Sequence, residues 1–159
     1  MTTRVDTRNL VGRECSSLER VRFAFADEPI EDVGPIIIGW SDGTFLTIDV
    51  GADWTLRLKQ ADWQDPYESL SDGERARIRH ENGVFVREAV AASDPINLVV
   101  GSELTALRRI GDEVDQIIGV GLSFGSLGIR AEAYGGELVV TATTTATESV
   151  PLDPDGRRG

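Results

Sequence analysis

The sequence is poor in the residue types on which most catalytic and structural chemistry depends. Its 159 residues include one cysteine, one histidine and, at Lys59, one lysine. A single cysteine excludes an intrachain disulfide framework. One histidine and one cysteine also fall short of a soft-ligand zinc site, which would need carboxylates alone or a second chain. We therefore expect no cofactor and no metal.

Long apolar runs are missing as well. No segment approaches the roughly 18 apolar residues of a membrane-spanning helix, and the first residues lack the apolar core of a signal peptide. We expect a cytoplasmic protein that does not bind membranes. A chain of this length is typical of one domain, and such a domain buries roughly 68–70% of its unfolded surface.

Basic residues are scarce relative to acidic ones. Asp and Glu number 27 against 16 Lys and Arg, which gives a formal net charge of −11. Nucleic-acid binding depends on basic patches, so this composition argues against it. An acidic surface suits a basic partner, but the same charge also serves simply to keep a protein soluble.

The sequence contains a rough copy of itself. Residues 10–21 align without gaps with residues 99–110. Such a repeat indicates two copies of one supersecondary unit that bury their apolar faces against each other. The residues that recur identically are Val11, Gly12, Glu14, Leu18 and Arg20.

Each copy continues into alternating apolar and polar residues separated by turn signals, the pattern of antiparallel strands. The first unit has apolar or alternating runs at residues 21–25, 34–40, 45–50 and 54–58. The second unit follows the same plan with residues 99–110, 117–124, 127–131 and 138–142. The alternation also predicts which side chains face the core. We expect Leu46, Ile48, Trp54, Leu56, Leu127, Ile129, Leu138 and Val140 to be buried, with Thr47, Asp49 and Arg57 outward.

The segment between the two units has a different pattern. Ser71 followed by Glu74 has the form of a capping box, which predicts a helix that runs to Glu81 and ends at residues 82–83. Residues 84–86 then begin another strand.

These patterns predict a mainly β fold. Two similar antiparallel meanders, the products of an internal duplication, pack as one barrel-like or sandwich domain, with one short helix in the connection. The expected organisation is a flexible N-terminus at 1–8, a domain at 9–142 with units 10–58 and 99–142 and a connecting segment 60–96, and a disordered tail at 143–159.

Two sequence motifs that are typical of enzymes occur in the chain, but neither is followed by the residues that its function requires. Residues 121–125 spell G-x-S-x-G, but a strand rather than a helix follows Ser123, and His80 precedes it in the chain. The glycines at 119 and 121 lack the third glycine of a dinucleotide-binding loop. We expect a protein that is not an enzyme.

The candidate binding site is the loop at residues 61–67, because Trp63 and Tyr67 lie beyond the predicted strand among polar residues. Tryptophan and tyrosine are favoured at binding hot spots, although the pair would equally serve to cap an open end of the core. The aspartates nearby could share a calcium ion, but their spacing lacks the EF-hand pattern. The candidate partner-binding residues are Asp49, Asp53, Asp62, Trp63, Asp65 and Tyr67.

Several motifs together resemble a group of small uncharacterised bacterial β-rich proteins over most of residues 10–142. These motifs are Leu-Val-Gly-Arg at 10–13, Ser-Asp-Gly at 41–43, Asp-Trp-Thr-Leu-Arg-Leu at 53–58 and Trp-Gln-Asp-Pro-Tyr at 63–67. The resemblance implies no activity and no catalytic residue. In size and acidity the chain is similar to immunity proteins that neutralise polymorphic toxins.

Three functional hypotheses follow, in order of preference. The first is a non-catalytic protein-binding domain, in its specific form an immunity protein for a basic toxin. The second is an accessory protein that binds a small molecule or peptide between the two units. The third is an enzyme that works through two carboxylates in different environments.

Overall fold

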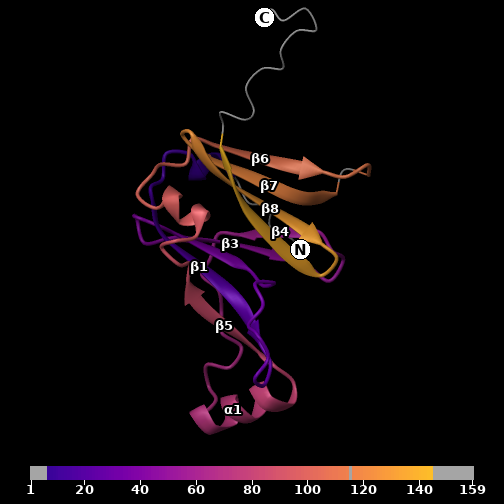
Figure 1. Ribbon diagram of the computed structural model, residues 1–159. Coiled ribbons are helices and arrows are strands. Elements are labelled where there is room, and N and C mark those ends of the chain that lie inside the picture. The colour runs from indigo at the N-terminus through magenta and orange to yellow at the C-terminus, as the bar shows by residue number, and fades with distance from the viewer. Residues whose placement is uncertain (1–6, 115, 145–159) are drawn as a thin grey trace, which may run out of the picture.

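Figure 1 shows a computed structural model of the chain, which describes residues 7–114 and 116–144. Within these ranges nine strands form two antiparallel sheets. The first sheet contains β1 (Cys15–Ala24), β2 (Ile36–Trp40), β3 (Phe45–Val50), β4 (Leu56–Lys59) and β5 (Val84–Ala89). The second contains β6 (Ala106–Gly111), β7 (Ile117–Phe124), β8 (Leu127–Tyr134) and β9 (Glu137–Thr144). The helices are η1 (Thr7–Leu10), α1 (Asp72–Glu81) and η2 (Pro95–Val99).

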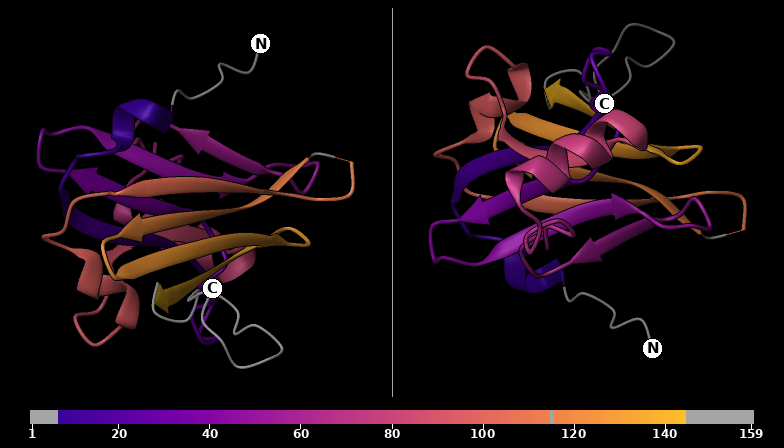
Figure 2. Two further views of the ribbon diagram at one scale, coloured as in Figure 1. Left: turned by 90° about the horizontal axis from the view of Figure 1, so that it is seen from above. Right: turned by 90° about the horizontal axis from the view of Figure 1, so that it is seen from below.

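The predicted mainly β architecture is confirmed. β1 to β4 pair in sequence order as one antiparallel meander, and β6 to β9 pair as a second. The sheets do not close into a barrel; they face each other as two layers (Figure 2). β5 adds a fifth strand to the first sheet by pairing with β1. The connecting segment therefore contributes to the sheet as well as to the helix.

The core lies between the two layers. Trp40 of β2 stacks on Phe124 of β7, with ring centroids 6.4 Å apart, and both side chains are buried. Apolar residues from alternate positions of both sheets surround this pair. They include Leu18, Ile36, Ile38, Leu46, Ile48, Leu56, Val120, Leu122, Ile129, Ala131 and Leu138.

The two segments that align in the sequence, residues 10–21 and 99–110, meet at one end of the sandwich through matched hydrogen bonds. The Gly12 N–H donates to the carbonyl of Leu104 (2.8 Å), and the Gly101 N–H donates to that of Cys15 (2.7 Å). Gly12 aligns with Gly101 and Cys15 with Leu104, so each bond is the counterpart of the other. A second matched pair runs from Cys15 N–H to the Ser102 carbonyl and from Leu104 N–H to the Arg13 carbonyl. These segments are thus related by a local approximate two-fold axis, while a common ancestry stays a prediction.

Positive φ angles explain why Gly12 and Gly101, which align in the sequence, are both glycine. Gly12 has φ +93° and Gly101 has φ +91°, a conformation that glycine adopts without a Cβ clash. The chain turns at both glycines to present their N–H groups to the other copy. Glycine therefore occurs at both aligned positions because both segments make the same turn.

The predicted alternation in β3 has the correct phase, with one difference in burial. Leu46 and Ile48 are fully buried between the sheets, and Asp49 and Thr47 lie on the opposite face. Thr47 is nevertheless buried, because another part of the chain covers this outer face. In the second unit Ile129 and Leu138 are buried as expected, whereas Leu127 and Val140 are half-buried.

The prediction that Trp54 belongs to the core is wrong. Its side chain is 64% exposed, and its backbone has φ +65° in the turn between β3 and β4. The Trp54 N–H donates to the Gly51 carbonyl (2.9 Å), and the Gly51 N–H to the Thr55 carbonyl (2.8 Å). Because these bonds close the turn, β4 begins at Leu56, two residues later than the alternation suggests.

We expect Trp54→Gly to raise the free energy of unfolding by up to about 1 kcal/mol. A bulky residue in the left-handed region is strained, whereas glycine adopts that region freely. Urea denaturation of the wild-type and variant chains measures the difference. A loss of about 3 kcal/mol or more, which is typical of deleting a core aromatic, would contradict the exposed position of Trp54.

The helix forms where the capping box predicts it. The Ser71 hydroxyl accepts a hydrogen bond from the Glu74 N–H (3.2 Å) and donates to the Glu74 carboxylate (3.1 Å). The helix ends at Glu81, and Gly83 follows with φ +86°. No helix among the described residues has the length and apolar character required to cross a membrane.

The predicted ends of the domain differ slightly from the observed elements. Thr7 and Arg8 belong to η1, and Thr143 and Thr144 to the last residues of β9. The remainder of the predicted flexible N-terminus (1–6) and disordered tail (145–159) lies outside the described residues.

Candidate partner-binding site

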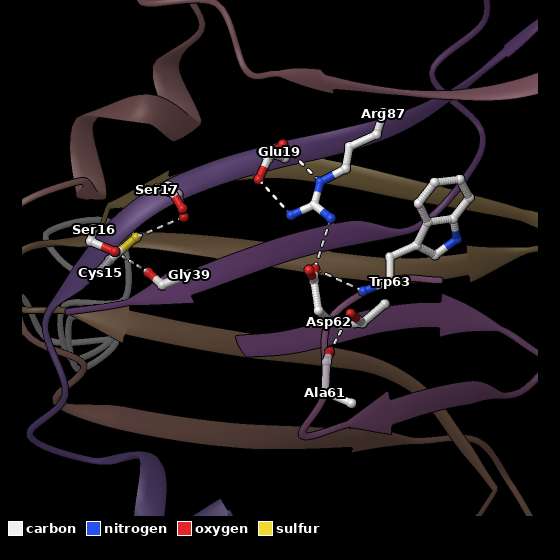
Figure 3. A network of polar contacts seen from close by, with 10 residues as sticks. Cys15, Ser16, Ser17, Glu19, Gly39, Ala61, Asp62, Trp63 and Arg87 are labelled. Atoms are coloured by element: carbon white, nitrogen blue, oxygen red, sulfur yellow. Dashed lines mark hydrogen bonds and ion pairs between the residues drawn. The ribbon is translucent and has the colours of Figure 1, made fainter. Parts of the chain in front are cut away.

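Residues 60–70, here called the strap, connect β4 to α1. Near its start, Ala61 and Asp62 lie against the outer face of the five-stranded sheet (Figure 3). The Thr47 hydroxyl of β3 donates to the Ala61 carbonyl at 2.8 Å. Ile37 of β2 pairs with Thr47 on this outer face and is fully buried. The strap thus lies on the side of the first sheet that faces away from the second sheet.

Arg87 of β5 joins the strap to the sheet. Its guanidinium binds the Glu19 carboxylate of β1 through two hydrogen bonds, of 2.8 and 2.7 Å, and pairs with Asp62 at 2.8 Å (Figure 3). The hydrogen bonds to Glu19 are the main reason that the pKa of Arg87 is raised. The same guanidinium lies 5.9 Å from the centre of the Phe45 ring, within cation–π range. One arginine therefore holds two strands and the strap together.

Asp62 and Asp65 shape the strap through their side chains. The Asp62 carboxylate accepts from the Trp63 N–H (2.9 Å), and the Asp65 carboxylate accepts from the Tyr67 N–H (2.8 Å). Asp65 also lies 3.7 Å from the Arg75 guanidinium of α1. Each of these aspartates thus fixes the backbone at one of the two aromatic residues and has an arginine beside it.

Trp63 and Tyr67 are both half-buried. Each residue therefore keeps part of its surface accessible. The hydrogen bond that Trp63 makes to a described residue comes from its backbone N–H and not from its indole (Figure 3). The strap therefore presents two aromatic surfaces on a backbone that is held in place by ion pairs and turn hydrogen bonds.

Asp49 and Asp53 lie in the hairpin between β3 and β4 rather than in the strap. Asp49 is opposite Arg57, and partial burial raises the pKa of its carboxyl group. Asp53 accepts hydrogen bonds from the Thr55 hydroxyl (2.8 Å) and N–H (3.2 Å), which lower its pKa. The predicted site residues therefore form two groups, with the strap holding Asp62, Trp63, Asp65 and Tyr67.

A pocket of about 390 Å³ opens where the strap, α1 and β5 meet. The sequence patterns did not predict this pocket, because the acidic and aromatic residues of the loop at 61–67 do not report the approach of α1 and β5. The available signal was the cluster of arginines on the predicted helix in a chain that is otherwise acidic. The pocket is lined by Asp65, Tyr67, Arg75, Ala76, Arg79, Val84, Phe85, Val86 and Arg87.

The nucleophilic and metal-binding groups of the described residues do not assemble into a reactive site. Ser123 lies within β7 and is followed by β8, and His80 is exposed on α1. Cys15 is buried, and burial raises the pKa of its thiol to about 11, so it is a neutral thiol at pH 7. No group of three His, Cys, Asp or Glu side chains in the described part of the chain could hold a metal ion.

Comparisons with protein-family models, with curated proteins and with solved structures found no match for this chain.

Proposed function

We propose that the protein is a non-catalytic protein-binding domain and that the strap is the centre of its binding surface. The observation that carries this proposal is the pair of half-exposed aromatics, Trp63 and Tyr67, on a segment fixed by Asp62, Asp65 and Arg87. Aromatic side chains dominate binding hot spots, and a surface that is already ordered loses less entropy on binding.

The specific form of this proposal is an immunity protein that acts in the cytoplasm on a basic toxin. The net charge of −11 supports it, because long-range attraction speeds association with a basic partner. Asp62 and Asp65 are already paired with arginines of this chain. The long-range attraction is therefore expected from the net charge of the whole molecule and not from these two carboxylates. In the strap, the two aspartates hold the aromatics in position.

A peptide-binding or small-molecule-binding accessory protein is the second candidate. The pocket between the strap, α1 and β5 favours it, because its lining combines aromatic, aliphatic and charged side chains. This candidate predicts a small molecule or free peptide that binds in the pocket without contacting Trp63, whereas the first predicts a partner protein whose contact includes the aromatics of the strap.

We expect Trp63→Ala to weaken binding to the partner about 30-fold, which corresponds to roughly 2 kcal/mol, while leaving the chain folded. The partner is captured on the immobilised wild-type chain from a lysate of the source organism, purified and titrated by calorimetry. Tyr67→Ala should weaken binding in the same way. Raised salt should slow association with a basic partner.

The matched control is Leu98→Ala in η2, whose side chain is 63% exposed and lies outside the strap. It should leave the affinity unchanged. Equal affinity of Trp63→Ala and Leu98→Ala for the purified partner would contradict the strap as the binding surface. Substrate turnover that is abolished by substituting one carboxylate or His80 would contradict the non-catalytic function.

A further inference from the structure

The pocket beside the strap has an excess of positive charge, although the chain as a whole is acidic. Three arginines line it, Arg75, Arg79 and Arg87, together with one carboxylate, Asp65. The Arg87 guanidinium already binds the carboxylates of Glu19 and Asp62. The other two arginines therefore decide which ligand the pocket suits.

Arg79 and Arg75 have unused hydrogen-bond donors. Among the described residues, the Arg79 guanidinium makes no hydrogen bond or ion pair. Arg75 lies beside Asp65 and donates to the Glu68 carbonyl (3.3 Å), but its Nε is buried and has no acceptor among the described residues. A buried donor without an acceptor is unfavourable, and guanidinium groups form strong charge-assisted hydrogen bonds with the carboxylates that a peptide side chain can supply.

The pocket also follows the free edge of a sheet. Its lining includes the consecutive residues 84–87 of β5, and consecutive side chains of a strand point to opposite faces. A pocket that touches all four must therefore run along the edge of the strand. β5 is the outermost strand of its sheet and pairs with β1 on one side.

The register shows which backbone groups of β5 are available at that edge. The N–H and carbonyl of Phe23 in β1 bond to Glu31, on the side away from β5. Phe23 and Phe85 are thus a non-hydrogen-bonded pair, and the backbone groups of Phe85 point away from β1. Arg87 lies two residues further along and has the same orientation. Both residues present an N–H and a carbonyl to an incoming strand.

We propose that the pocket binds an extended peptide segment that adds as a strand to the edge of β5 and places a carboxylate side chain against the guanidinium groups of Arg79 and Arg75. The proposal rests on the proposed protein-binding function and specifies the form of the partner's contact. Backbone hydrogen bonds to Phe85 and Arg87 give affinity, and the guanidinium groups select an acidic residue. Phe85, which is 39% exposed, and Tyr67 provide the apolar surface beside the peptide.

The test selects ligands for the full chain from a phage-displayed library of random 12-residue peptides. We expect the selected peptides to share an Asp or Glu, and to bind Arg79→Gln at least tenfold more weakly than the wild type. Arg77→Gln is the matched control, because Arg77 is an exposed arginine on the same helix that does not line the pocket. It should bind the peptides as the wild type does.

N-methylation of single backbone amides in one selected peptide tests the strand addition. We expect alternate positions to lose binding tenfold or more, because every second amide of an added strand donates to β5. The proposal is overturned if no peptide is selected, if the selected peptides lack an acidic residue, if Arg77→Gln weakens binding as much as Arg79→Gln, or if every N-methylated peptide binds normally. Partner capture that depends on Trp63 but not on Arg79 would overturn this inference and leave the proposed function standing.

Discussion

Trp40→Ala is expected to lower the free energy of unfolding by about 3–5 kcal/mol, the range found when a buried aromatic is truncated in a core. Trp40 is 2% exposed, lies between the sheets and stacks on Phe124 of the second sheet. Truncation removes this contact and leaves a cavity at the point where both layers meet. Urea denaturation followed by circular dichroism measures the loss.

Trp40→Phe is the matched variant for this site. The indole N–H of Trp40 is buried without an acceptor among the described residues, so phenylalanine keeps most of the apolar contact and removes an unsatisfied donor. We expect it to cost less than about 1.5 kcal/mol. A Trp40→Ala chain that is nearly as stable as the wild type would contradict the packing of the two sheets around this residue.

Arg20→Met is expected to lower the free energy of unfolding by about 3 kcal/mol, because it removes a buried cation that serves several carbonyls. Arg20 of β1 donates to the carbonyls of Gly34 (3.1 Å) and Asp32 (3.0 Å), and also to that of Leu138 in β9. Burial lowers the pKa of the guanidinium, and nearby Asp32 opposes that shift. One side chain thus connects the first sheet to the second.

Arg20→Lys separates the charge from the geometry. Lysine keeps the cation but lacks the planar fork that reaches several carbonyls at once, so we expect a loss between those of the wild type and Arg20→Met. Thermal unfolding of the three chains in one buffer gives the order. Equal stability of Arg20→Met and the wild type would show that the Leu138 carbonyl does not depend on this contact.

The strands and the helix could be predicted from the sequence because their signals are local. Alternation in residues 45–50 gives the inward face of β3, and Ser71 with Glu74 marks the start of α1. Trp54 shows where this logic fails. Its spacing from Leu56 matches a strand, but the turn hydrogen bonds that place it outside the strand depend on the backbone path, which alternation does not report.

The candidate site could be predicted only in part, because sequence patterns report local features and not contacts between distant segments. The position of Trp63 and Tyr67 in a polar loop was visible in the sequence, and the structure leaves both half-exposed. The partners of the loop aspartates were not visible, because Arg87 and Arg75 come from a strand and a helix that approach only in the folded chain. The burial of Thr47 and the pocket at β5 arise from the same long-range contacts.

Hydrogen–deuterium exchange of the chain, alone and in complex with the captured partner, tests the strap as the binding surface most directly. Backbone amides become protected where a partner covers them or adds a strand. We predict slower exchange in residues 60–70 and in β5 of the complex, with no change in η2. Unchanged exchange in the strap, with protection confined to the second sheet, would contradict the proposed binding surface.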